Sequence, residues 1–187
     1  DTELAASLAR TASRLVDGLG TARVVAALRA GLIELRPVVA GDRAQLFAWN
    51  DHPTVRSASF SSDPIDPYEH DRWFALLLDD PDRHAWIASV ADGSSAIGLI
   101  RFAVDGPEAV VSVALDAEHQ GRGWGAGLIM AGCAALAEVR PRVERVVALI
   151  KPDNGRSASS FRAAGFDPIG ALDATADRYV YPMGARS

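Results

Sequence analysis

Cysteine and long hydrophobic runs are the two features that this sequence most clearly lacks. Its 187 residues include one cysteine, Cys133, so no internal disulfide can form. Cys133 stands in an apolar stretch, where a buried core thiol is expected rather than a nucleophile. No apolar run approaches the roughly 20 residues that a membrane-spanning helix needs. Residues 1–30 carry acids and arginines and no secretory signal, and we therefore expect a cytoplasmic protein without a membrane partner.

A surplus of basic residues and a cluster of metal ligands are also absent from the sequence. The net charge is −5, which argues against nucleic acid as a partner because such proteins need a basic face. The histidines are scattered without the spacing of metal ligands, so we expect no metal site. They are His52, His70, His84 and His119. A chain that is 49% hydrophobic and 23% charged is typical of one globular domain, with or without an extension.

Turn residues and apolar spacing predict an alternation of helices and strands. Asp92-Gly93 and Asp105-Gly106 separate three apolar runs, which is typical of antiparallel hairpins. A buried helix and a β-branched run follow, so we expect an α/β fold with a mixed, mostly antiparallel sheet of about seven strands and helices on both faces. The expected helices cover 3–16, 21–30, 42–49, 68–78, 125–139 and 156–164. The expected strands cover 32–39, 84–90, 96–104, 108–115 and 143–150, with two short strands within 166–182.

Four alternating glycines form the most informative stretch of the chain, which reads Gln120-Gly121-Arg122-Gly123-Trp124-Gly125-Ala126-Gly127. Glycine lets a ligand approach the main chain closely. At the start of a helix, such a loop offers free N–H groups and the positive end of the helix dipole, which together bind anions. The stretch therefore predicts a site for a phosphate-bearing cofactor, with a plain tight turn as the structural alternative.

Two common phosphate loops fit this stretch poorly. A P-loop ends in Lys followed by Ser or Thr, and this stretch has neither. A dinucleotide-binding loop follows its strand almost directly within a repeating βαβ pattern, whereas here 116–120 intervene and hairpins come before. The next strand also ends in Lys151, where that motif expects an acid that binds ribose.

Two patterns of the chain together resemble a known superfamily. The glycine stretch reads Gln120-x-x-Gly123-x-Gly125, and about thirty residues later the chain reads Asn154-x-x-Ser157-x-x-x-Phe161-x-x-x-Gly165-Phe166. In order and spacing they resemble the Q/R-x-x-G-x-G/A and N-x-x-A-x-x-x-Y-x-x-x-G-F motifs of the GNAT superfamily of N-acetyltransferases. The resemblance covers about 32–182. It implies a GNAT fold with a splayed cofactor cleft, acetyl-CoA as cosubstrate, and direct attack of a primary amine on the thioester.

The resemblance also implies which residues bind the cofactor. Backbone amides of 122–126 would bind the pyrophosphate of acetyl-CoA. The pantetheine arm would lie where the strand ending at Leu115 splays from strand 143–150. Asn154 would bind near the thioester or the pantetheine arm, and it is also a candidate helix cap. The full predicted set is Val113, Ala114, Leu115, Gln120, Gly121, Arg122, Gly123, Trp124, Gly125, Ala126, Asn154, Ser157 and Phe161.

The chain departs from the motif at Phe161, where many members have a tyrosine that protonates the leaving thiolate. A thiol has an unperturbed pKa of about 8.5, so its thiolate leaves tolerably without a strong acid. Water, Ser157 or Ser160 could supply the proton, and a backbone N–H near Ala114 could stabilise the oxyanion. Base candidates are His70, Glu108 and His119, with a water chain as the alternative.

A further resemblance concerns the acceptor. The stretch 46–56 and the pattern His70-x-x-Trp73-Phe74 are similar to the branch that acts on nucleotide-linked 4-amino sugars in nonulosonic (pseudaminic) acid synthesis. That branch has relatives acting on protein N-termini. It implies an acceptor pocket lined by Trp49, Asn50, Arg56, His70 and Trp73. A helix C-cap and a surface salt bridge are the structural alternatives for Asn50 and Arg56.

The stretch 17–25 resembles the C-terminal end of the UDP-sugar hydrolase of the same pathway, which is sometimes fused to an acetyltransferase. We therefore expect 1–30 to be a helical extension or the remnant of a preceding domain, and 31–187 to be the acetyltransferase domain, as a monomer or homodimer. Three rival functions stay open at this point. They are transfer to a peptide or protein N-terminus, transfer to another small amine, and non-catalytic binding of acyl-CoA, which Phe161 supports.

Overall fold

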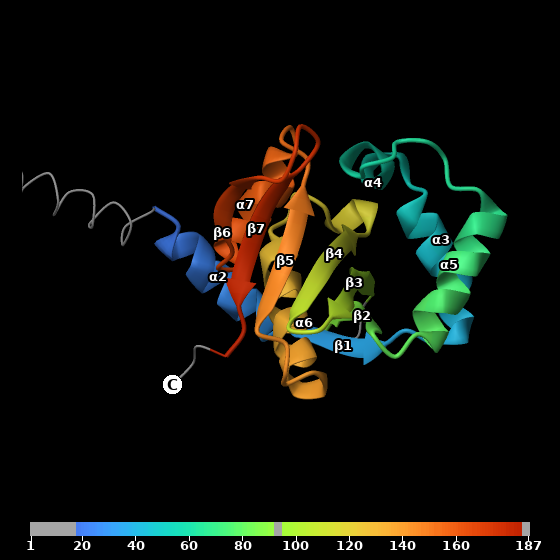
Figure 1. The fold of residues 1–187 in the computed structure, drawn as a ribbon, viewed down its shortest axis with the longest axis horizontal. Helices are drawn as coiled ribbons and strands as arrows, with labels where there is room; N and C mark the ends of the chain where they lie inside the picture. Colours follow the sequence, from blue (N-terminus) through green and yellow to red (C-terminus); the bar gives the residue numbers. More distant parts are fainter. Residues whose placement is uncertain (1–17, 92–94, 185–187) are drawn as a thin grey trace, which may run out of the picture.

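One mixed sheet organises the structure, a computed structural model that describes residues 18–91 and 95–184. Its seven strands lie in the order β1-β2-β3-β4-β5-β7-β6 (Figure 1). Strands β4 and β5 are parallel, and all other neighbours in the sheet are antiparallel. The predicted mixed, mostly antiparallel sheet is therefore confirmed. The strands are β1 (Ile33–Pro37), β2 (Arg83–Val90), β3 (Ala96–Asp105), β4 (Glu108–Leu115), β5 (Arg145–Ile150), β6 (Asp167–Ala171) and β7 (Asp177–Pro182).

Helices cover both faces of the sheet, as predicted (Figure 1). On one face, α6 (Trp124–Val139) packs with α7 (Gly155–Ala163) over the larger apolar core. On the other face, α3 (Arg43–Asn50) and α5 (Pro67–Asp79) cover a smaller core. Helix α6 is apolar over most of its surface because it is enclosed between the sheet and a further helix.

That further helix is α2 (Gly20–Ala30), which packs against α6 and also contacts α7. The two backbones approach closely at Gly127. A Cβ placed there would lie 2.9 Å from the Cβ of Arg29 and 3.1 Å from the backbone nitrogen of Ala30. The described part of the expected extension 1–30 thus contacts the rest of the fold directly. The helix expected over 3–16 lies outside the described residues, and the domain boundary at residue 30 stays a prediction.

A short helix that the sequence analysis did not predict, α4 (Pro53–Ala58), follows α3. Its start is well defined locally. The Nδ1 atom of His52 accepts a hydrogen bond from the N–H of Thr54, and Pro53 stands at the first helical position. Two short 3-10 helices complete the fold, η1 (Ala40–Asp42) before α3 and η2 (Ala117–His119) after β4.

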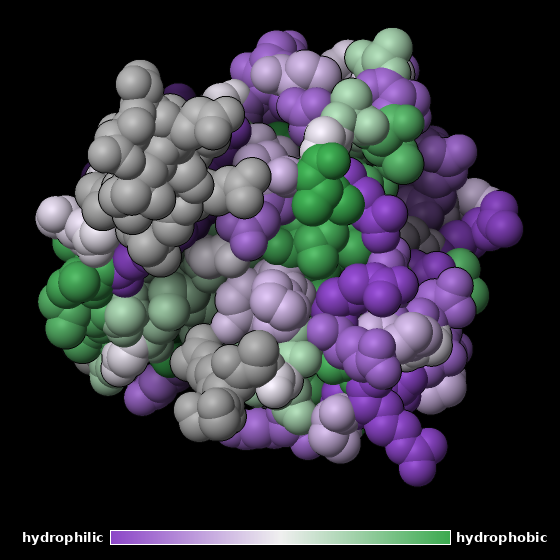
Figure 2. Space-filling view, turned by 60° about the vertical axis from the view of Figure 1, so that its left-hand side comes forward, coloured by the Kyte–Doolittle hydropathy of each residue, from purple (hydrophilic) through white to green (hydrophobic). Residues whose placement is uncertain are grey.

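Several large apolar side chains are exposed on α2, on β6 and directly after β6. Val24 and Leu28 of α2 are 60% and 67% exposed, and Ile169 and Leu172 are more than half exposed. Figure 2, which brings the α2 side of the molecule forward, shows apolar patches on this face interrupted by polar residues. None of the described helices is long and apolar enough to cross a membrane.

Candidate active site

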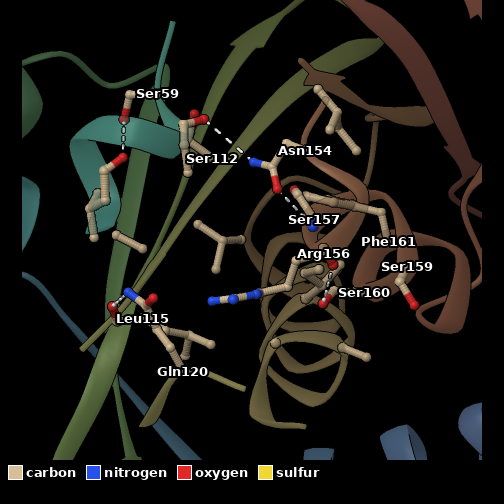
Figure 3. A pocket seen from close by; sticks show the side chains of 18 of the residues that line it. Ser59, Ser112, Leu115, Gln120, Asn154, Arg156, Ser157, Ser159, Ser160 and Phe161 are labelled. Atoms are coloured by element: carbon tan, nitrogen blue, oxygen red, sulfur yellow. Dashed lines mark hydrogen bonds between the residues drawn. The ribbon is translucent and has the colours of Figure 1, made fainter. Parts of the chain in front are cut away.

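A cleft opens where β4 and β5 stop pairing. The parallel register joins Glu108–Val111 of β4 to 145–148 of β5 and goes no further, so 112–115 of β4 diverge from the end of β5. A cavity of about 1080 Å³ occupies this gap. Figure 3 shows side chains of β4 and of α7 facing each other across it. The predicted splayed cleft is thus present.

The start of α6 forms one end of the cavity. Gly121 and Gly123 have φ angles of +72° and +79°, a left-handed backbone that glycine adopts without strain. Gly123 is the N-cap of α6, and no side chain among the described residues caps this end. The first N–H groups of α6 therefore remain available to an anion. A Cβ at Gly125 would lie 3.0 Å from the Oγ of Ser160, so this glycine also lets α6 approach α7.

The start of α7 forms the opposite wall. The Oδ1 atom of Asn154 accepts a hydrogen bond from the N–H of Ser157 at 3.1 Å, which caps the helix. Its Nδ2 group donates to the carbonyl of Ala58 at 3.5 Å. Phe161 is buried and packs edge-to-face on Phe166, with ring centroids 4.9 Å apart. Phe161 thus brings an apolar ring, and no proton donor, to the cavity wall.

Helix α4 joins the two walls across the mouth of the cavity. Gln120, which follows β4, donates through Nε2 to the Oγ1 of Thr54 and to the carbonyl of Leu115, both at 3.1 Å. On the other side, the ammonium group of Lys151 donates to the carbonyl of Ser57 at 3.3 Å. Sequence reasoning missed this element, although the pair His52-Pro53 is a recognisable helix start.

Most of the predicted cofactor residues line this cavity. They are Val113, Ala114, Leu115, Gln120, Gly121, Gly123, Gly125, Ala126, Asn154, Ser157 and Phe161. Arg122 is exposed and lies outside the wall, and Trp124 packs instead beneath Arg29, whose Cζ lies 4.5 Å from the indole centroid. That these residues bind acetyl-CoA stays a prediction at this point.

The predicted acceptor residues are not brought together as expected. Asn50 and Arg56 line the cavity, whereas Trp49, His70 and Trp73 do not. The indole N–H of Trp49 donates to Asp116 at 3.0 Å, and its ring is buried in the smaller core with Leu46 and Phe74. The three side chains lie elsewhere because α3 and α5 direct them toward the sheet and toward each other.

His70 is 3% exposed and lies among aromatic rings. Its ring centroid is 5.1 Å from that of Phe47 and 5.3 Å from that of Trp73. Neither ring nitrogen has a hydrogen-bond partner among the described residues. Burial lowers the pKa of His70, because an apolar surrounding disfavours the charged imidazolium. This placement does not suit a base that must reach an amine in the cavity.

Glu108 also lies away from the cavity, at the other end of β4. Its carboxylate accepts hydrogen bonds from Arg145 at 2.7 Å and from Arg178 at 2.8 Å, so it links β4, β5 and β7. His119 flanks the cofactor loop, with Nδ1 3.2 Å from Asp116. Of the side chains predicted to move a proton, the two serines Ser157 and Ser160 line the cavity. In the ranges that the structure describes, no group of three His, Cys, Asp or Glu side chains could hold a metal ion.

The cavity wall carries a surplus of positive charge that the sequence analysis did not predict. Its cationic side chains are Arg56, Arg101, Lys151 and Arg156, and its one carboxylate is Asp153. Within the part of the chain that the structure describes, these cations take part in no ion pair with a carboxylate. Burial lowers the pKa of the Arg101 guanidinium, and Arg83 nearby lowers it further. The one sequence signal for Arg101 was a single charge inside the apolar run 97–102.

Comparisons with known sequences point to an acetyltransferase domain. A family model described as acetyltransferase (GNAT) domain matches residues 33–167. Mycothiol acetyltransferases of Mycobacterium strains JLS and MCS are each 28% identical over 180 residues, which cover 89% of this chain. The chain spans 59% of the length of these curated relatives.

Solved structures share the fold at lower identity. A spermidine N-acetyltransferase from Vibrio cholerae, in complex with CoA and spermine, superposes with a TM-score of 0.70 at 16% identity, over 81% of this chain and 96% of that one. An aminoglycoside acetyltransferase in complex with coenzyme A gives 0.68 at 18% identity, over 80% and 94%. At these identities the likeness establishes a common architecture.

Proposed function

This chain belongs to the acetyltransferase (GNAT) domain family, and we propose that it transfers an acetyl group from acetyl-CoA directly to a primary amine. One observation carries the proposal. The start of α6, which follows Gly121 and Gly123 and has no side-chain cap, lines the same cavity as the end of β4 that does not pair with β5. A helix N-terminus suits a pyrophosphate, and a free strand edge suits the amide groups of pantetheine. The predicted superfamily and fold are confirmed by the family match.

The proposed cofactor lies along the splayed cleft. Its pyrophosphate contacts the backbone N–H groups of 123–126, and its pantetheine arm runs beside 112–115 of β4. Asn154 uses its amide nitrogen toward the cofactor while its oxygen caps α7. This arrangement directs the thioester toward the middle of the cavity, between β4 and the start of α7.

The proposed reaction is one displacement at the thioester carbonyl. A neutral amine attacks, the C–N bond forms and the C–S bond breaks. A backbone N–H near Ala114 stabilises the oxyanion. The amine gives its proton to water, because His70 and Glu108 lie outside the cavity. The thiolate takes a proton from water or from Ser157, since Phe161 has none to give.

The proposed acceptor is the amine of an amino sugar, with a nucleotide-linked sugar as the first choice. Asn50 and Arg56 support this proposal because both line the cavity and offer hydrogen bonds to hydroxyl or phosphate groups. A peptide N-terminus and another small amine remain the alternative acceptors. A non-catalytic acyl-CoA-binding module is the alternative of another class, and it is favoured by the phenyl ring of Phe161 where the motif has a proton donor.

The test is acetyl-CoA turnover with a panel of amines. The panel contains a UDP-linked amino sugar, free glucosamine, a short peptide and spermidine, and a reaction without amine measures hydrolysis. Free thiol reports CoA release, and mass spectrometry identifies the acetylated product. We expect release with an amino sugar above the hydrolysis rate. Release with the peptide alone would replace the sugar by the peptide acceptor, and acetyl-CoA binding without any release would establish the binding module.

A further inference from the structure

Arg101 is a cationic side chain of the cavity wall to which the proposed transfer assigns no role. It lies on β3, lines the cavity and places its guanidinium carbon 4.8 Å from the ring centroid of Trp73. Its neighbour in the register of β4 is Ser112, which lines the same cavity. Because directly opposite residues of adjacent strands point to the same face of a sheet, Arg101 and Ser112 present their side chains together.

No carboxylate neutralises Arg101 within the described ranges. The charged group that acts on it is Arg83, which has its own partner in Asp80 at 3.1 Å. The other charges of the cavity wall are Arg56, Lys151, Arg156 and Asp153, so the balance is positive. A guanidinium held in a partly buried wall without a counter-charge is unfavourable, and an anionic ligand would remove that penalty.

The position of Arg101 separates it from the region of the cofactor phosphates. In the β3–β4 register, Leu115 at the end of β4 lies opposite Gly98, and Arg101 is three residues further along β3. A strand rises about 3.3 Å per residue, so Arg101 stands about 10 Å along the sheet from the loop that leads to α6. Arg101 also shares a sheet face with Leu99, which packs with α3 and α5, whereas α6 covers the opposite face.

We propose that Arg101, with Ser112 beside it, binds an anionic group, a carboxylate or a phosphate, on the amine acceptor. The proposal rests on the acetyl transfer proposed above and narrows its acceptor class to amines that also carry negative charge. A guanidinium binds either anion through two parallel hydrogen bonds, and the Ser112 hydroxyl adds a third donor. Polyamines and aminoglycosides carry several positive charges, so this wall would repel them.

The test compares three 2-amino sugars that differ in their anionic group. Glucosamine has none, muramic acid has a carboxylate and glucosamine 6-phosphate has a phosphate; spermidine serves as the polycation. The variants are Arg101→Gln, Arg101→Lys and the control Arg142→Gln, which removes an exposed arginine after α6 that lies outside the cavity wall. We expect the wild type to turn over one anionic sugar at least tenfold more efficiently than glucosamine, and that sugar identifies carboxylate or phosphate.

In Arg101→Gln, the KM for that anionic sugar should rise about 10- to 100-fold, the range for a hydrogen bond to a charged group. The KM for glucosamine and the Kd for acetyl-CoA should stay within about twofold, as they should for every acceptor in Arg142→Gln. Arg101→Lys should fall between, because it keeps the charge and loses the paired geometry; it also carries the test if the glutamine variant does not fold.

Two outcomes would overturn the inference alone. One is equal efficiency with neutral and anionic sugars or a preference for spermidine, and the other is an anionic preference that persists in Arg101→Gln. Absence of CoA release with every amine of this panel and of the panel used to test the proposed function would overturn the proposed transfer itself, and the inference with it.

Discussion

At the scale of single residues, Gly123 combines a special backbone with a special place. Its φ of +79° stands at the N-cap of α6, and the three atoms nearest to a Cβ there would all belong to the Arg29 side chain, the closest at 3.6 Å. The protein itself can therefore accommodate a methyl group apart from the backbone strain. The proposed pyrophosphate, bound to the N–H groups of α6, would occupy the open side of Gly123. A methyl group at this position would therefore collide with it.

We expect Gly123→Ala to weaken acetyl-CoA binding by at least tenfold in calorimetric titration. Gly106→Ala is the matched control, since Gly106 also has a positive φ of +56°, lies in the β3–β4 turn, and has nothing within 4 Å of a Cβ. In urea denaturation, both variants should lose about 1–2 kcal/mol of unfolding free energy, the cost of a left-handed backbone conformation for an L-amino acid. Equal affinity in the two variants would mean that the glycine loop is a structural turn.

Two substitutions separate the two functions of Asn154, the cap of α7 and the proposed contact with the cofactor. Asn154→Ala removes the Ser157 N–H acceptor and should cost about 1 kcal/mol of stability as a lost cap. Asn154→Asp keeps the acceptor and therefore the helix cap, so it should lose less stability than Asn154→Ala. It replaces the donating amide, which also reaches the Ala58 carbonyl at 3.5 Å, by a negative charge. We expect both variants to bind acetyl-CoA several-fold more weakly. Normal affinity of the stable aspartate variant would show that Asn154 is a cap without a cofactor contact.

At the scale of the elements, α2 adds a wall to the cofactor cleft that the two motifs do not contain. Ala22, Val25 and Ala26 of this helix line the cavity, and Arg29 lies over Trp124 at the start of α6. The same guanidinium is the nearest group to the open side of Gly123. Helix α2 thus brings a positive charge to the place where we propose the phosphates.

Arg29→Gln should therefore weaken acetyl-CoA binding several-fold at low salt. The difference from the wild type should shrink at high salt, because the lost attraction is between charges. Removing the contact with Trp124 should also cost about 0.5–1 kcal/mol of stability. Arg142→Gln controls for net charge in the same titrations. An unchanged Kd at low salt would limit Arg29 to packing between α2 and α6.

The elements that the sequence predicted are those with local signals. Asp105-Gly106 indicated the β3–β4 hairpin, and the alternating glycines indicated an anion site at the start of a buried helix. Helix α4 could not be predicted in its place over the cleft. Its contacts come from Gln120, Lys151 and Asn154, which are 66 to 96 residues away in the chain.

The buried position of His70 argues against the role of base predicted for it, and the sequence already held that information. His70, Phe74 and Leu77 are spaced as one face of a helix, and all three are buried. That spacing indicates a core position rather than a base. Arg101 was missed for a different reason: a charge inside an apolar strand does not reveal whether it meets an opposite charge. Only the packing shows that its neighbours leave it without one in the described structure.

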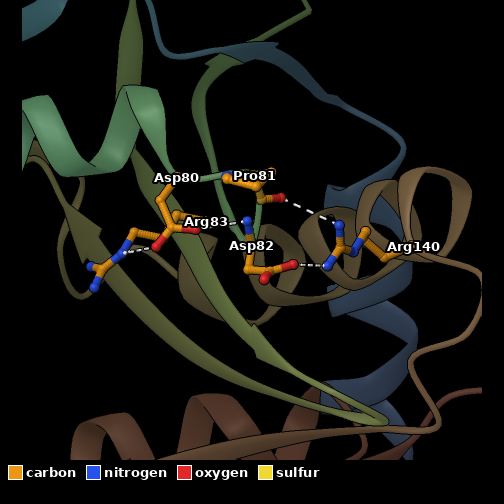
Figure 4. Close-up of polar contacts among 5 residues, drawn as sticks. All are labelled: Asp80, Pro81, Asp82, Arg83 and Arg140. Atoms are coloured by element: carbon orange, nitrogen blue, oxygen red, sulfur yellow. Dashed lines mark hydrogen bonds and ion pairs between the residues drawn. The ribbon is translucent and has the colours of Figure 1, made fainter.

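At the scale of the whole molecule, two buried ionisable groups, Asp42 and His70, and the half-buried His84 make stability depend on pH. Burial lowers the pKa of His70 and of His84. The positive charge of Arg140 lowers the pKa of His84 further. Arg140 also forms an ion pair with Asp82 (Figure 4). Hydrogen bonds from Arg36 hold the pKa of Asp42 below its usual value, despite the opposing effect of burial. In all three, the unfolded chain binds protons more readily than the folded one.

The free energy of unfolding should therefore fall as the pH decreases, so the fold is less stable in acid. The histidine contribution is complete above the unfolded pKa of about 6.5 and is lost as pH falls below it toward the lowered values of the folded state. The Asp42 contribution is complete above about 3.9 and is lost only in more acidic solution, as pH falls through the folded pKa. Urea unfolding at pH 7.5 and pH 5.5 isolates the histidine part, because Asp42 stays ionised at both values.

His70→Phe tests the assignment of that part to the aromatic cluster between α3 and α5. The variant removes the titrating ring and no hydrogen bond of normal length among the described residues. It also removes the contact of Nδ1 with the Asp71 carboxylate at 3.9 Å, which opposes the effect of burial on the pKa of His70. The loss of stability from pH 7.5 to 5.5 should be smaller in the variant, by no more than about 1.4 kcal/mol, the limit for one imidazole over this interval. Turnover of acetyl-CoA should keep its pH profile, because His70 lies outside the cavity. A changed profile with unchanged stability would return His70 to the role of base.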